Sequence, residues 1–503
     1  MNHVVTPIRP IEGPAPRAAA AAPAQPDRAG MEEIFADFRL RDRWKPNYRA
    51  RDVGDGVFLS SDQGSWALLS RDEYRALRSI ALPRALHDLL EERGLILTAR
   101  NADSVMRAYE DWSANYFPGT ALHIIGMTRR CNLRCAYCHA AVVRDSSDPA
   151  RYDLDEATAR AIVDFAYQSP SSRIHFEFQG GEATLNFGAV RYLHAYAMIK
   201  NLAHKRALSF SIVSNGVELP DEVLDYLAAS RINITTSIEF DAAEHPSLRV
   251  DWDGRCHWDD IRRNRARMRE RGLDVPSLIV VGRNNLHKLR DYVDFAVAEG
   301  QSSIFFSPVQ KMGFAKGKWD NVGMDMDEFF NAWRDALDYI FSLWDQGILL
   351  EERYFSLALE KLFNNRDVKY VDFRNPSGMV LGNLAYDHLG NVYGCDEGRG
   401  HADFRIGNVH TDSYAAAVTS DKARQLVSYS LREHDACQVC AYRPYCGVSP
   451  IVSKGETHSL DPQPLTSSCC QRTRHLFDFV VKLMRERPQR VDQALTIIRM
   501  STQ

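Results

Sequence analysis

The sequence predicts an α/β protein built around a partial (β/α)6 barrel. A small winged-helix-like module precedes the barrel, and a loop-rich, cysteine-bearing domain follows it. Strand-like and helix-like segments alternate six times from Ala121 onward, which favours a parallel sheet with outer helices. The stretch after Asn375 is loop-rich and holds six of the ten cysteines of the 503-residue chain. In a chain of this length, such cysteines suggest metal binding or catalysis before disulfides.

The composition argues against two classes of protein. The hydrophobic fraction of 45% and the charged fraction of 25% are ordinary for a globular protein. A net charge of -4 argues against nucleic-acid binding through a broad basic surface. No apolar run approaches the roughly 20 residues that span a bilayer. We therefore expect neither a nucleic acid nor a membrane as partner.

The N-terminal part divides into a tail and a module. Residues 1–46 are expected to be mostly disordered, because their first part is rich in Ala and Pro, and Pro interrupts helices. Residues 47–115 form the module, in which short apolar runs bounded by Gly, Asp and Ser predict strands. The predicted strands are Gly56–Leu59 and Ser65–Leu69, and the predicted helices are Asp72–Ser79 and Pro83–Arg93. By its pattern alone, the module is an extension that packs on the next domain.

Residues 116–325 form the predicted barrel. Its strands are the apolar runs Leu122–Met127, Ile174–Phe178, Leu208–Val213, Ile232–Ile238, Leu278–Val281 and Ile304–Phe306. Its helices are Leu154–Tyr167, Ala189–His204, Asp221–Ala229, Trp258–Arg271 and Leu286–Ala298. Functional sites in such folds form on loops beyond the carboxyl ends of the strands. Polar residues at those ends are therefore the first candidates for a site.

The C-terminal part begins with a predicted helical bridge over residues 326–375, made of helices at Met326–Trp344 and Tyr354–Asn364. Residues 376–503 are predicted to form a loop-rich domain that ends in a helix at Thr473–Arg485. Little core periodicity is visible in this domain. Metal ligation is a candidate for holding it together, because binding energy then substitutes for burial.

Three cysteines directly follow the first predicted strand. Cys131, Cys135 and Cys138 have the spacing C-x3-C-x2-C. Three thiolates on one short loop can converge on a single inorganic cluster. An iron–sulfur cubane normally takes four thiolates, so three leave one iron open to a small molecule. Zinc is the competing metal, although structural zinc prefers four protein ligands.

This cysteine group, with Tyr137 before its third cysteine, resembles the signature of the radical S-adenosylmethionine (SAM) superfamily. The resemblance implies that Cys131, Cys135 and Cys138 hold a [4Fe-4S] cluster whose open iron binds the amino and carboxylate groups of SAM. One-electron reduction then cleaves SAM to methionine and a 5′-deoxyadenosyl radical, which abstracts a hydrogen atom from the substrate.

The second predicted strand ends in a motif similar to one with which this family contacts SAM. Gly180, Gly181 and Glu182 match the family's Gly-Gly-Glu-Pro, and Ala183 stands in place of the proline. Two glycines let the backbone approach a ligand closely, and a carboxylate can pair with an ammonium group. The resemblance implies that these three residues contact the methionyl amine of SAM.

Later strand ends carry further candidates for SAM binding. Ser214 and Asn215 precede a glycine, similar to the family's Thr-Asn-Gly, and Ser237 matches a serine that contacts SAM. The residues Glu239 and Phe240 depart from the Ser-Leu-Asp-Gly pattern of relatives. Arg283 ends the fifth strand, where it can contact a carboxylate. For Ser214, Asn215 and Arg283, ordinary polar strand ends are the alternative interpretation.

A second cysteine group lies near the C-terminus. Its members are Cys395, Cys437, Cys440, Cys446, Cys469 and Cys470. Four of these thiolates suit either a second cubane or a zinc site. Their order resembles the SPASM extension of radical SAM enzymes, which commonly carries two auxiliary [4Fe-4S] clusters.

This chain departs from the SPASM pattern at two places. The window Asn375–Leu381 contains no cysteine, and Pro450 stands where relatives have one. We therefore predict one auxiliary [4Fe-4S] cluster instead of two. Its ligands are Cys437, Cys440, Cys446 and either Cys469 or Cys470. Cys395 is left as a free thiol, a ligand in an altered site, or a hydrogen donor.

Asp396, directly after Cys395, is a candidate acid–base. Some SPASM enzymes place a catalytic Asp at this position, although Asp396 also fits an ordinary polar turn. A carboxylate near a radical site can remove a proton after hydrogen abstraction.

The C-terminal cysteine region most resembles the His-Xaa-Ser system maturases, which are radical SAM/SPASM enzymes of ribosomally synthesised peptides. The resemblance implies a precursor peptide as substrate, an external one-electron reductant, and hydrogen abstraction from a side chain followed by a carbon–carbon or related crosslink. It also implies that the module at residues 47–115 recognises a leader peptide, which such modules bind as an added strand. Reduced clusters and many thiols suit a cytoplasmic location.

Three alternative functions stay open. One is a formylglycine-forming sulfatase maturase, and another is a peptide epimerase in which Cys395 donates hydrogen. A third, from a different class, is a non-catalytic iron–sulfur scaffold or sensor that binds a peptide.

Four other residues that could bind a ligand are expected to have ordinary structural roles. We interpret His139 as a local contact beside Cys138, His245 and Arg249 as part of a solvated loop, and Cys256 as a buried hydrophobic residue.

Overall fold

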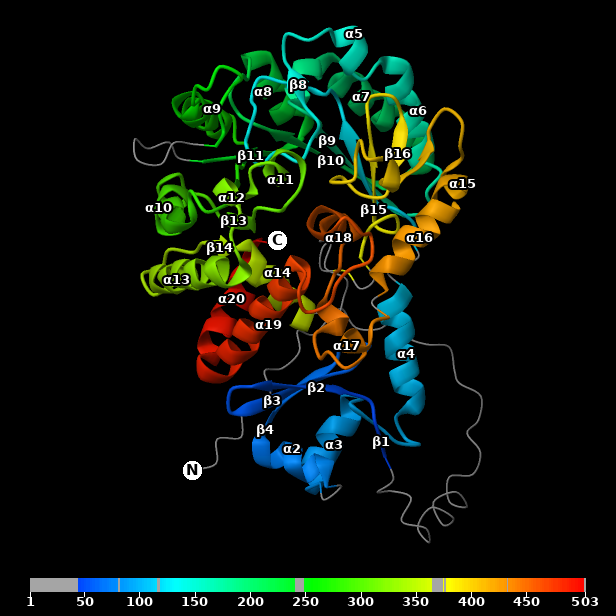
Figure 1. The fold of residues 1–503 in the computed structure, drawn as a ribbon, viewed down its shortest axis with the longest axis vertical. Helices are drawn as coiled ribbons and strands as arrows, with labels where there is room; N and C mark the ends of the chain where they lie inside the picture. The colour runs from blue at the N-terminus through cyan, green and yellow to red at the C-terminus, as the bar shows by residue number, and fades with distance from the viewer. Residues whose placement is uncertain are drawn as a thin grey trace.

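A computed structural model describes residues 44–79, 82–114, 118–239, 248–363, 374, 377–431 and 433–501. Nearly all of the predicted disordered tail lies outside these residues, as do Phe240 and His245. The central feature is a ten-stranded sheet whose helices lie on its outer side (Figure 1). Among the described helices, none is long and apolar enough to cross a membrane.

The barrel wall consists of seven parallel strands. Their order in the sheet is β14-β13-β12-β11-β10-β9-β6, so neighbours along the chain are also neighbours in space. All six predicted strands are present, which confirms the α/β partial barrel. The strands are β6 (Leu122–Gly126), β9 (Arg173–Gln179), β10 (Ala207–Ser214), β11 (Asn233–Ser237), β12 (Ser277–Val281), β13 (Ser303–Pro308) and β14 (Glu351–Glu352).

The barrel helices cover the apolar face of the strands. Ile174, Phe176 and Phe178 of β9 are buried in a core shared with the helices after β8 and β9, whereas the alternating residues of this strand are polar. This period of two is that of a strand with one covered face. The helices are α5 (Pro149–Tyr152), α6 (Glu156–Ala166), α7 (Phe187–His204), α8 (Asp221–Ser230), α9 (Trp258–Glu270) and α10 (Leu289–Ala298). Short 3-10 turns are η3 (Ala183–Asn186) and η4 (Leu286–Lys288).

The N-terminal module is a three-stranded antiparallel sheet with helices beside it. Its sheet contains β2 (Arg49–Val53), β3 (Gly56–Ser60) and β4 (Trp66–Ser70), and its helices are α2 (Arg71–Arg78), α3 (Arg84–Glu92) and α4 (Ala102–Ser113). A separate pair joins β1 (Lys45–Pro46) to β5 (Ile96–Leu97). The start of α2 is fixed by a capping box between Ser70 and Glu73.

The module is attached to the C-terminal domain by its third strand. Phe58 is fully buried, and its ring lies 5.7 Å from that of Tyr442 and 6.4 Å from that of Tyr445. The Arg51 guanidinium donates two hydrogen bonds of 2.6 Å to the Asp478 carboxylate. Figure 1 shows the module directly below the C-terminal helices.

The helical bridge and the last two helices pack together. They share a core that contains Trp333, Tyr354, Phe355 and Phe477. The bridge consists of α13 (Met326–Trp344) and α14 (Arg353–Phe363), and the last two helices are α19 (Ser468–Glu486) and α20 (Pro488–Ser501). Two short helices, α11 (Gly313–Lys316) and α12 (Trp319–Val322), precede the bridge.

The domain between the bridge and α19 has more regular structure than the sequence predicted. Its strand β15 (Asn383–Tyr386) pairs in parallel with β6, and β16 (Asn391–Tyr393) and β17 (Arg405–Asn408) extend the same sheet. Its helical segments are η6 (Ala402–Phe404), α15 (Tyr414–Val418), α16 (Asp421–Ser430), α17 (Asp435–Gln438), η7 (Arg443–Tyr445) and α18 (Pro450–Thr457). Leu384, Phe404 and Leu426 are fully buried in the core of the barrel sheet. This part of the chain therefore contributes buried residues to the core, although its sequence shows little core periodicity.

Candidate functional site

The first cysteine group lies on the loop that follows β6. This loop runs from β7 (Arg130–Cys131) to β8 (Val143–Arg144), two short strands that pair in parallel. Backbone hydrogen bonds hold its middle in place: Arg134 N–H donates to Val250 O over 2.7 Å, and Ala136 N–H donates to Leu248 O over 2.9 Å. Phe314 N–H donates to Cys138 O over 2.9 Å. The loop is thus fixed over the carboxyl end of the barrel.

The three thiols of this loop lie in one electrostatic environment. Cys131 and Cys135 are buried and Cys138 is partly buried. Burial raises the pKa of each thiol, to about 12 for Cys138, and the neighbouring thiols raise the pKa of Cys131 and Cys138 further. A cationic metal cluster relieves this penalty, because it neutralises the thiolates it binds. The three sulfur donors on one loop suit a [4Fe-4S] cluster with one open iron.

The two glycines after β9 are needed for a close backbone approach. A Cβ atom on Gly181 would lie 2.2 Å from Arg130 O, and one on Gly180 would lie 2.4 Å from Thr128 O. Gly180 also has a φ of 141°, which favours glycine. Gly181 N–H donates to Thr128 O and Glu182 N–H donates to Arg130 O, each over 2.8 Å. This turn therefore packs against the segment that leads into the cysteine loop.

The buried Glu182 carboxylate joins the ends of β9 and β10. It accepts hydrogen bonds from Asn215 N–H over 2.7 Å and from Ser214 Oγ over 3.0 Å. Burial raises the pKa of Glu182, although these hydrogen bonds lower it in part. The Asn215 amide nitrogen donates to Asn132 Oδ1 over 2.6 Å and lies 3.8 Å from Cys131 Sγ. The structure thus brings Glu182, Ser214 and Asn215 to the first cysteine.

Arg249 is a residue that the sequence analysis placed wrongly. It is only 5% exposed instead of lying on a solvated loop. Its guanidinium lies 3.3 Å from the Tyr137 hydroxyl and donates to Asn215 O over 3.2 Å. Its charge lowers the pKa of Cys135, in opposition to burial. A single sequence gives no signal for burial of an arginine in an irregular segment.

For two of the predicted SAM-binding residues, the structure describes no hydrogen bond or ion pair to Glu182, Ser214, Asn215 or the cysteine loop. Arg283 is 58% exposed at its side chain, and its Nε donates to Gly323 O over 2.9 Å. Ser237 lies half-buried at the end of β11. Their proposed contacts with SAM stay predictions.

Asp396 lies between two cationic or polar side chains. Its Oδ2 is 3.2 Å from His139 Nε2, and its Oδ1 is 3.1 Å from Arg399 Nη2. Burial raises the pKa of Asp396, but the charge of Arg399 and the hydrogen bond from His139 lower it more, so the pKa falls below its usual value. His139 is therefore the partner of the candidate acid–base, which the sequence analysis missed.

A cavity of about 240 Å³ brings this acid–base together with the glycine turn. Gly180, Gly181, His139, Asp396 and Arg399 all line it. The neighbouring Cys395 is instead buried in the hydrophobic core near Phe404. It lines neither this cavity nor the larger one beside the second cysteine group.

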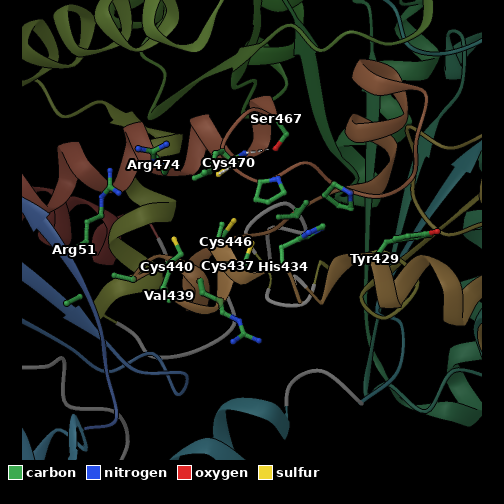
Figure 2. A pocket seen from close by; sticks show the side chains of 18 of the residues that line it. Arg51, Tyr429, His434, Cys437, Val439, Cys440, Cys446, Ser467, Cys470 and Arg474 are labelled. Carbon is green, nitrogen blue, oxygen red and sulfur yellow. Dashed lines mark hydrogen bonds between the residues drawn. The ribbon is translucent and has the colours of Figure 1, made fainter.

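The second cysteine group surrounds a cavity of about 510 Å³. Figure 2 shows the side chains of Cys437, Cys440, Cys446 and Cys470 converging on it. Cys469 is instead 3% exposed within the core of the barrel sheet. The two neighbours differ because they lie on the first turn of α19, where adjacent residues point about 100° apart. All ten cysteines lie among the described residues, and none forms a disulfide.

The position of Pro450 has a structural reason. It is the first residue of α18, where proline is favoured because its missing N–H has no partner within the helix. It stands where relatives place a cysteine, as the sequence analysis noted.

Comparisons with known proteins match part of the chain to one family model and most of it to one fold. Residues 125–296 match the family model of the radical SAM superfamily. A cysteine-type anaerobic sulfatase-maturating enzyme from Clostridium perfringens is 21% identical over 335 residues, which cover 65% of this chain and 88% of that protein.

Two solved structures share the fold over most of this chain. Native anSMEcpe with bound AdoMet has a TM-score of 0.62 and 18% identity, and the match covers 75% of this chain and 100% of that chain. Streptococcus suis SuiB bound to its precursor peptide SuiA has a TM-score of 0.52 and 14% identity, with 85% of this chain and 100% of that chain covered.

Proposed function

This chain is a radical SAM superfamily enzyme, and from that premise we propose that it matures a ribosomally synthesised peptide. The reaction is abstraction of a side-chain hydrogen, followed by a carbon–carbon or related crosslink. One observation carries the proposal: Asp396 lines the same cavity as Gly180 and Gly181 of the motif that contacts SAM in relatives. The complex of SuiB with its precursor peptide, in a protein of similar fold, further supports a peptide substrate.

The cofactor site is proposed from the side chains around the first cysteine group. Radical SAM enzymes bind a [4Fe-4S] cluster and SAM. Cys131, Cys135 and Cys138 would hold the cluster, and Gly180, Gly181, Glu182, Asn215 and Ser237 would hold SAM. When bound, these groups supply a 5′-deoxyadenosyl radical for hydrogen abstraction. Glu182 keeps the ends of β9 and β10 at a fixed separation through its bonds to Ser214 and Asn215.

Asp396 is the proposed proton acceptor. Arg399 and His139 favour its ionised form, so that its carboxylate can accept a proton at Oδ1 or Oδ2. Its 8% exposure limits access of bulk water to that proton.

The second cysteine group is proposed to hold one auxiliary [4Fe-4S] cluster. Its ligands would be Cys437, Cys440, Cys446 and Cys470, the four cysteines that line one cavity. Iron quantification near eight per chain supports this inventory, because each cubane holds four irons. A value near twelve contradicts it, and about four irons with one zinc supports the zinc alternative.

The remaining partners belong to the same proposal. The N-terminal module would bind the leader of the precursor peptide at an edge of its sheet, where β2 and β4 are the edge strands. An external one-electron reductant would reduce the first cluster. The thiol-rich sites suit a cytoplasmic location.

The test is anaerobic reconstitution with SAM, a reductant and small peptides encoded beside this protein. Release of 5′-deoxyadenosine excludes a purely binding scaffold. Tandem mass spectrometry then reads the product: loss of two hydrogens between two residues supports a crosslink, and an unchanged mass supports epimerisation. A product that reacts with a hydrazide supports formylglycine formation, the alternative favoured by the similarity to a sulfatase-maturating enzyme.

A further inference from the structure

The 240 Å³ cavity has buried polar atoms that lack hydrogen bonds within the protein. It lies between the first cysteine loop, the glycine turn after β9 and the β15–β16 turn. Among its lining side chains, His388 Nδ1, Asp396 Oδ1 and Arg399 Nη1 are buried and make no hydrogen bond. His388 and Asp396 are each 8% exposed, and the Arg399 side chain is 10% exposed. Buried polar atoms are rarely left unpaired, so three on one cavity call for a hydrogen-bonding partner from outside the protein.

Each of these atoms has a defined hydrogen-bonding role. His388 Nε2 lies 3.2 Å from Arg151 O, so Nε2 carries the hydrogen and Nδ1 is left as an acceptor. Burial lowers the pKa of His388, which favours this neutral form. Arg399 is a permanent donor. Asp396 Oδ1 is an acceptor, whose contact with Arg399 Nη2 at 3.1 Å is an ion pair without hydrogen-bond geometry. The cavity therefore offers one donor and two acceptors.

The size of the cavity limits what can enter it. At about 240 Å³ it is smaller than the 300–1,000 Å³ usual for drug-sized ligands. This volume suits one amino-acid side chain.

The donor and acceptor pattern limits the chemistry further. A carboxylate has no hydrogen to give to His388 and Asp396, and it is repelled by the Asp396 charge. An ammonium group cannot accept a hydrogen bond from Arg399. A group that both donates and accepts satisfies all three atoms.

We propose that this cavity is a substrate subsite that binds a neutral, polar side chain of the peptide, with a hydroxyl, carboxamide or imidazole head. His388 and Arg399 are its specificity-determining residues. The inference rests on the proposed peptide substrate and deepens it, because it states which side chain the peptide presents beside Asp396.

The test uses the reconstituted holoenzyme saturated with SAM. The probes are N-acetyl amino-acid N-methylamides of Asn, Ser, Leu, Asp and Lys, and their binding is measured by saturation-transfer NMR. We expect the Asn and Ser probes to bind at least tenfold more tightly than the other three. Equal binding of all five probes overturns the proposal.

Two variants locate the binding. His388→Phe removes the acceptor and should abolish the preference for Asn and Ser. His194→Phe is the matched control, because His194 bonds to Tyr226 on the outer helices and should keep the preference. A preference that survives in His388→Phe overturns the subsite. Arg399→Met is a second, independent test. It should weaken the binding of the Asn and Ser probes and leave the binding of the Leu, Asp and Lys probes unchanged.

Two further measurements separate the possible failures. If free methionine displaces the probes, or if they bind only without SAM, the cavity belongs to the methionyl end of SAM and the proposal is overturned. Release of 5′-deoxyadenosine is followed in the same samples. If the wild type releases no 5′-deoxyadenosine, the proposed function is contradicted. If it releases 5′-deoxyadenosine but binds all five probes equally, only the subsite is contradicted.

Discussion

At the scale of single residues, the most informative contacts join groups that are distant in the sequence. His139 follows the third cysteine of the first group, and its imidazole meets Asp396 at 3.2 Å. Asn215 directly follows β10, and its side-chain amide lies 3.8 Å from Cys131 Sγ. Such contacts place the candidate acid–base and the candidate SAM-binding residues around one loop.

Replacing Asp396 with Asn tests its role as a proton acceptor. We expect release of 5′-deoxyadenosine to persist while the amount of modified peptide falls by roughly 10²-fold, a common contribution of general acid–base catalysis. Both are measured by chromatography and mass spectrometry. Asp403→Asn is the control. Asp403 lies on the same segment as Asp396, but its half-exposed carboxylate pairs with Lys454. Undiminished product from Asp396→Asn removes Asp396 from the mechanism.

Glu352 predicts a pH dependence of stability that is separate from catalysis. Burial raises the pKa of its carboxyl to about 7, from 4.5 in the unfolded chain. Its contribution is therefore fully present below pH 4.5 and is lost as the pH rises from 4.5 through 7, by about 3 kcal/mol at pH 8. Glu352→Gln should remove this loss.

The measurement for Glu352 is urea unfolding of the wild type and of Glu352→Gln at pH 6 and pH 8. Glu352→Gln should be more stable than the wild type by a larger margin at pH 8. At that pH the unfolded wild type is ionised at Glu352, and folding must either protonate or desolvate this carboxylate, whereas Gln carries no charge. An advantage that is the same at both values contradicts a raised pKa.

At the scale of elements, two short segments determine the geometry of the proposed metal sites. One is the glycine turn after β9, which packs on the segment before Cys131. The other is the first turn of α19, which turns Cys470 into the cavity and Cys469 into the core.

Gly181→Ala tests the glycine turn. The added Cβ would lie 2.2 Å from Arg130 O, so the cysteine loop must shift. We expect reconstituted iron to fall by about four per chain, since only the first cubane is affected. Gly188→Ala is the control, because no atom lies within 4 Å of its Cβ position and alanine is favoured in a helix. Equal iron content in both variants contradicts the importance of the close approach.

Cys470→Ser and Cys469→Ser form a matched pair on adjacent residues. The first should lower the iron content from about eight to about four per chain, and the second should leave it near eight. Iron is measured colorimetrically, with electron paramagnetic resonance to identify the cluster lost. The reverse outcome shows that Cys469 is the ligand.

The sequence predicted the elements of the barrel well but not how distant elements meet. Strands such as β9 and β10 alternate apolar and polar residues over much of their length, so local pattern alone locates them. The pairing of β15 with β6 joins residues about 260 positions apart, which no local pattern reports. Burial of Arg249 and the choice between Cys469 and Cys470 likewise depend on tertiary contacts. In both cases, residues from distant segments of the chain determine which side chain is buried.

At the scale of the whole molecule, the N-terminal module is part of the body that holds the second cysteine group. Its residues Ala50, Arg51 and Asp52 line the cavity of those cysteines. The Ser60 hydroxyl and the Arg49 side chain donate to the backbone oxygens of Ala441 and Gln438, beside Cys440 and Cys437. Peptide binding on this module would therefore occur close to the proposed auxiliary cluster.

Phe58→Ala tests this attachment. The ring is fully buried between the module and Tyr442, so its loss should destabilise the protein by about 3–5 kcal/mol. The change is read as a lower midpoint of denaturant unfolding. Tyr109→Ala, on the half-exposed face of α4, should have little effect. A module that merely rests on the body would instead give similar small changes for both variants.

The parallel pairing of β15 with β6 has a consequence for how the enzyme can open. The cysteine loop follows β6, and the segment that carries Asp396 follows β15 and its partner β16. Adjacent strands are held about 4.8 Å apart by their hydrogen bonds. The cysteine loop and the segment that carries Asp396 are therefore anchored to one sheet. Any opening between them would require rearrangement of the loops rather than of the sheet. A chimera that exchanges the C-terminal domain must also preserve the register of Leu384 with His123, because a slip of one residue turns every side chain to the opposite face.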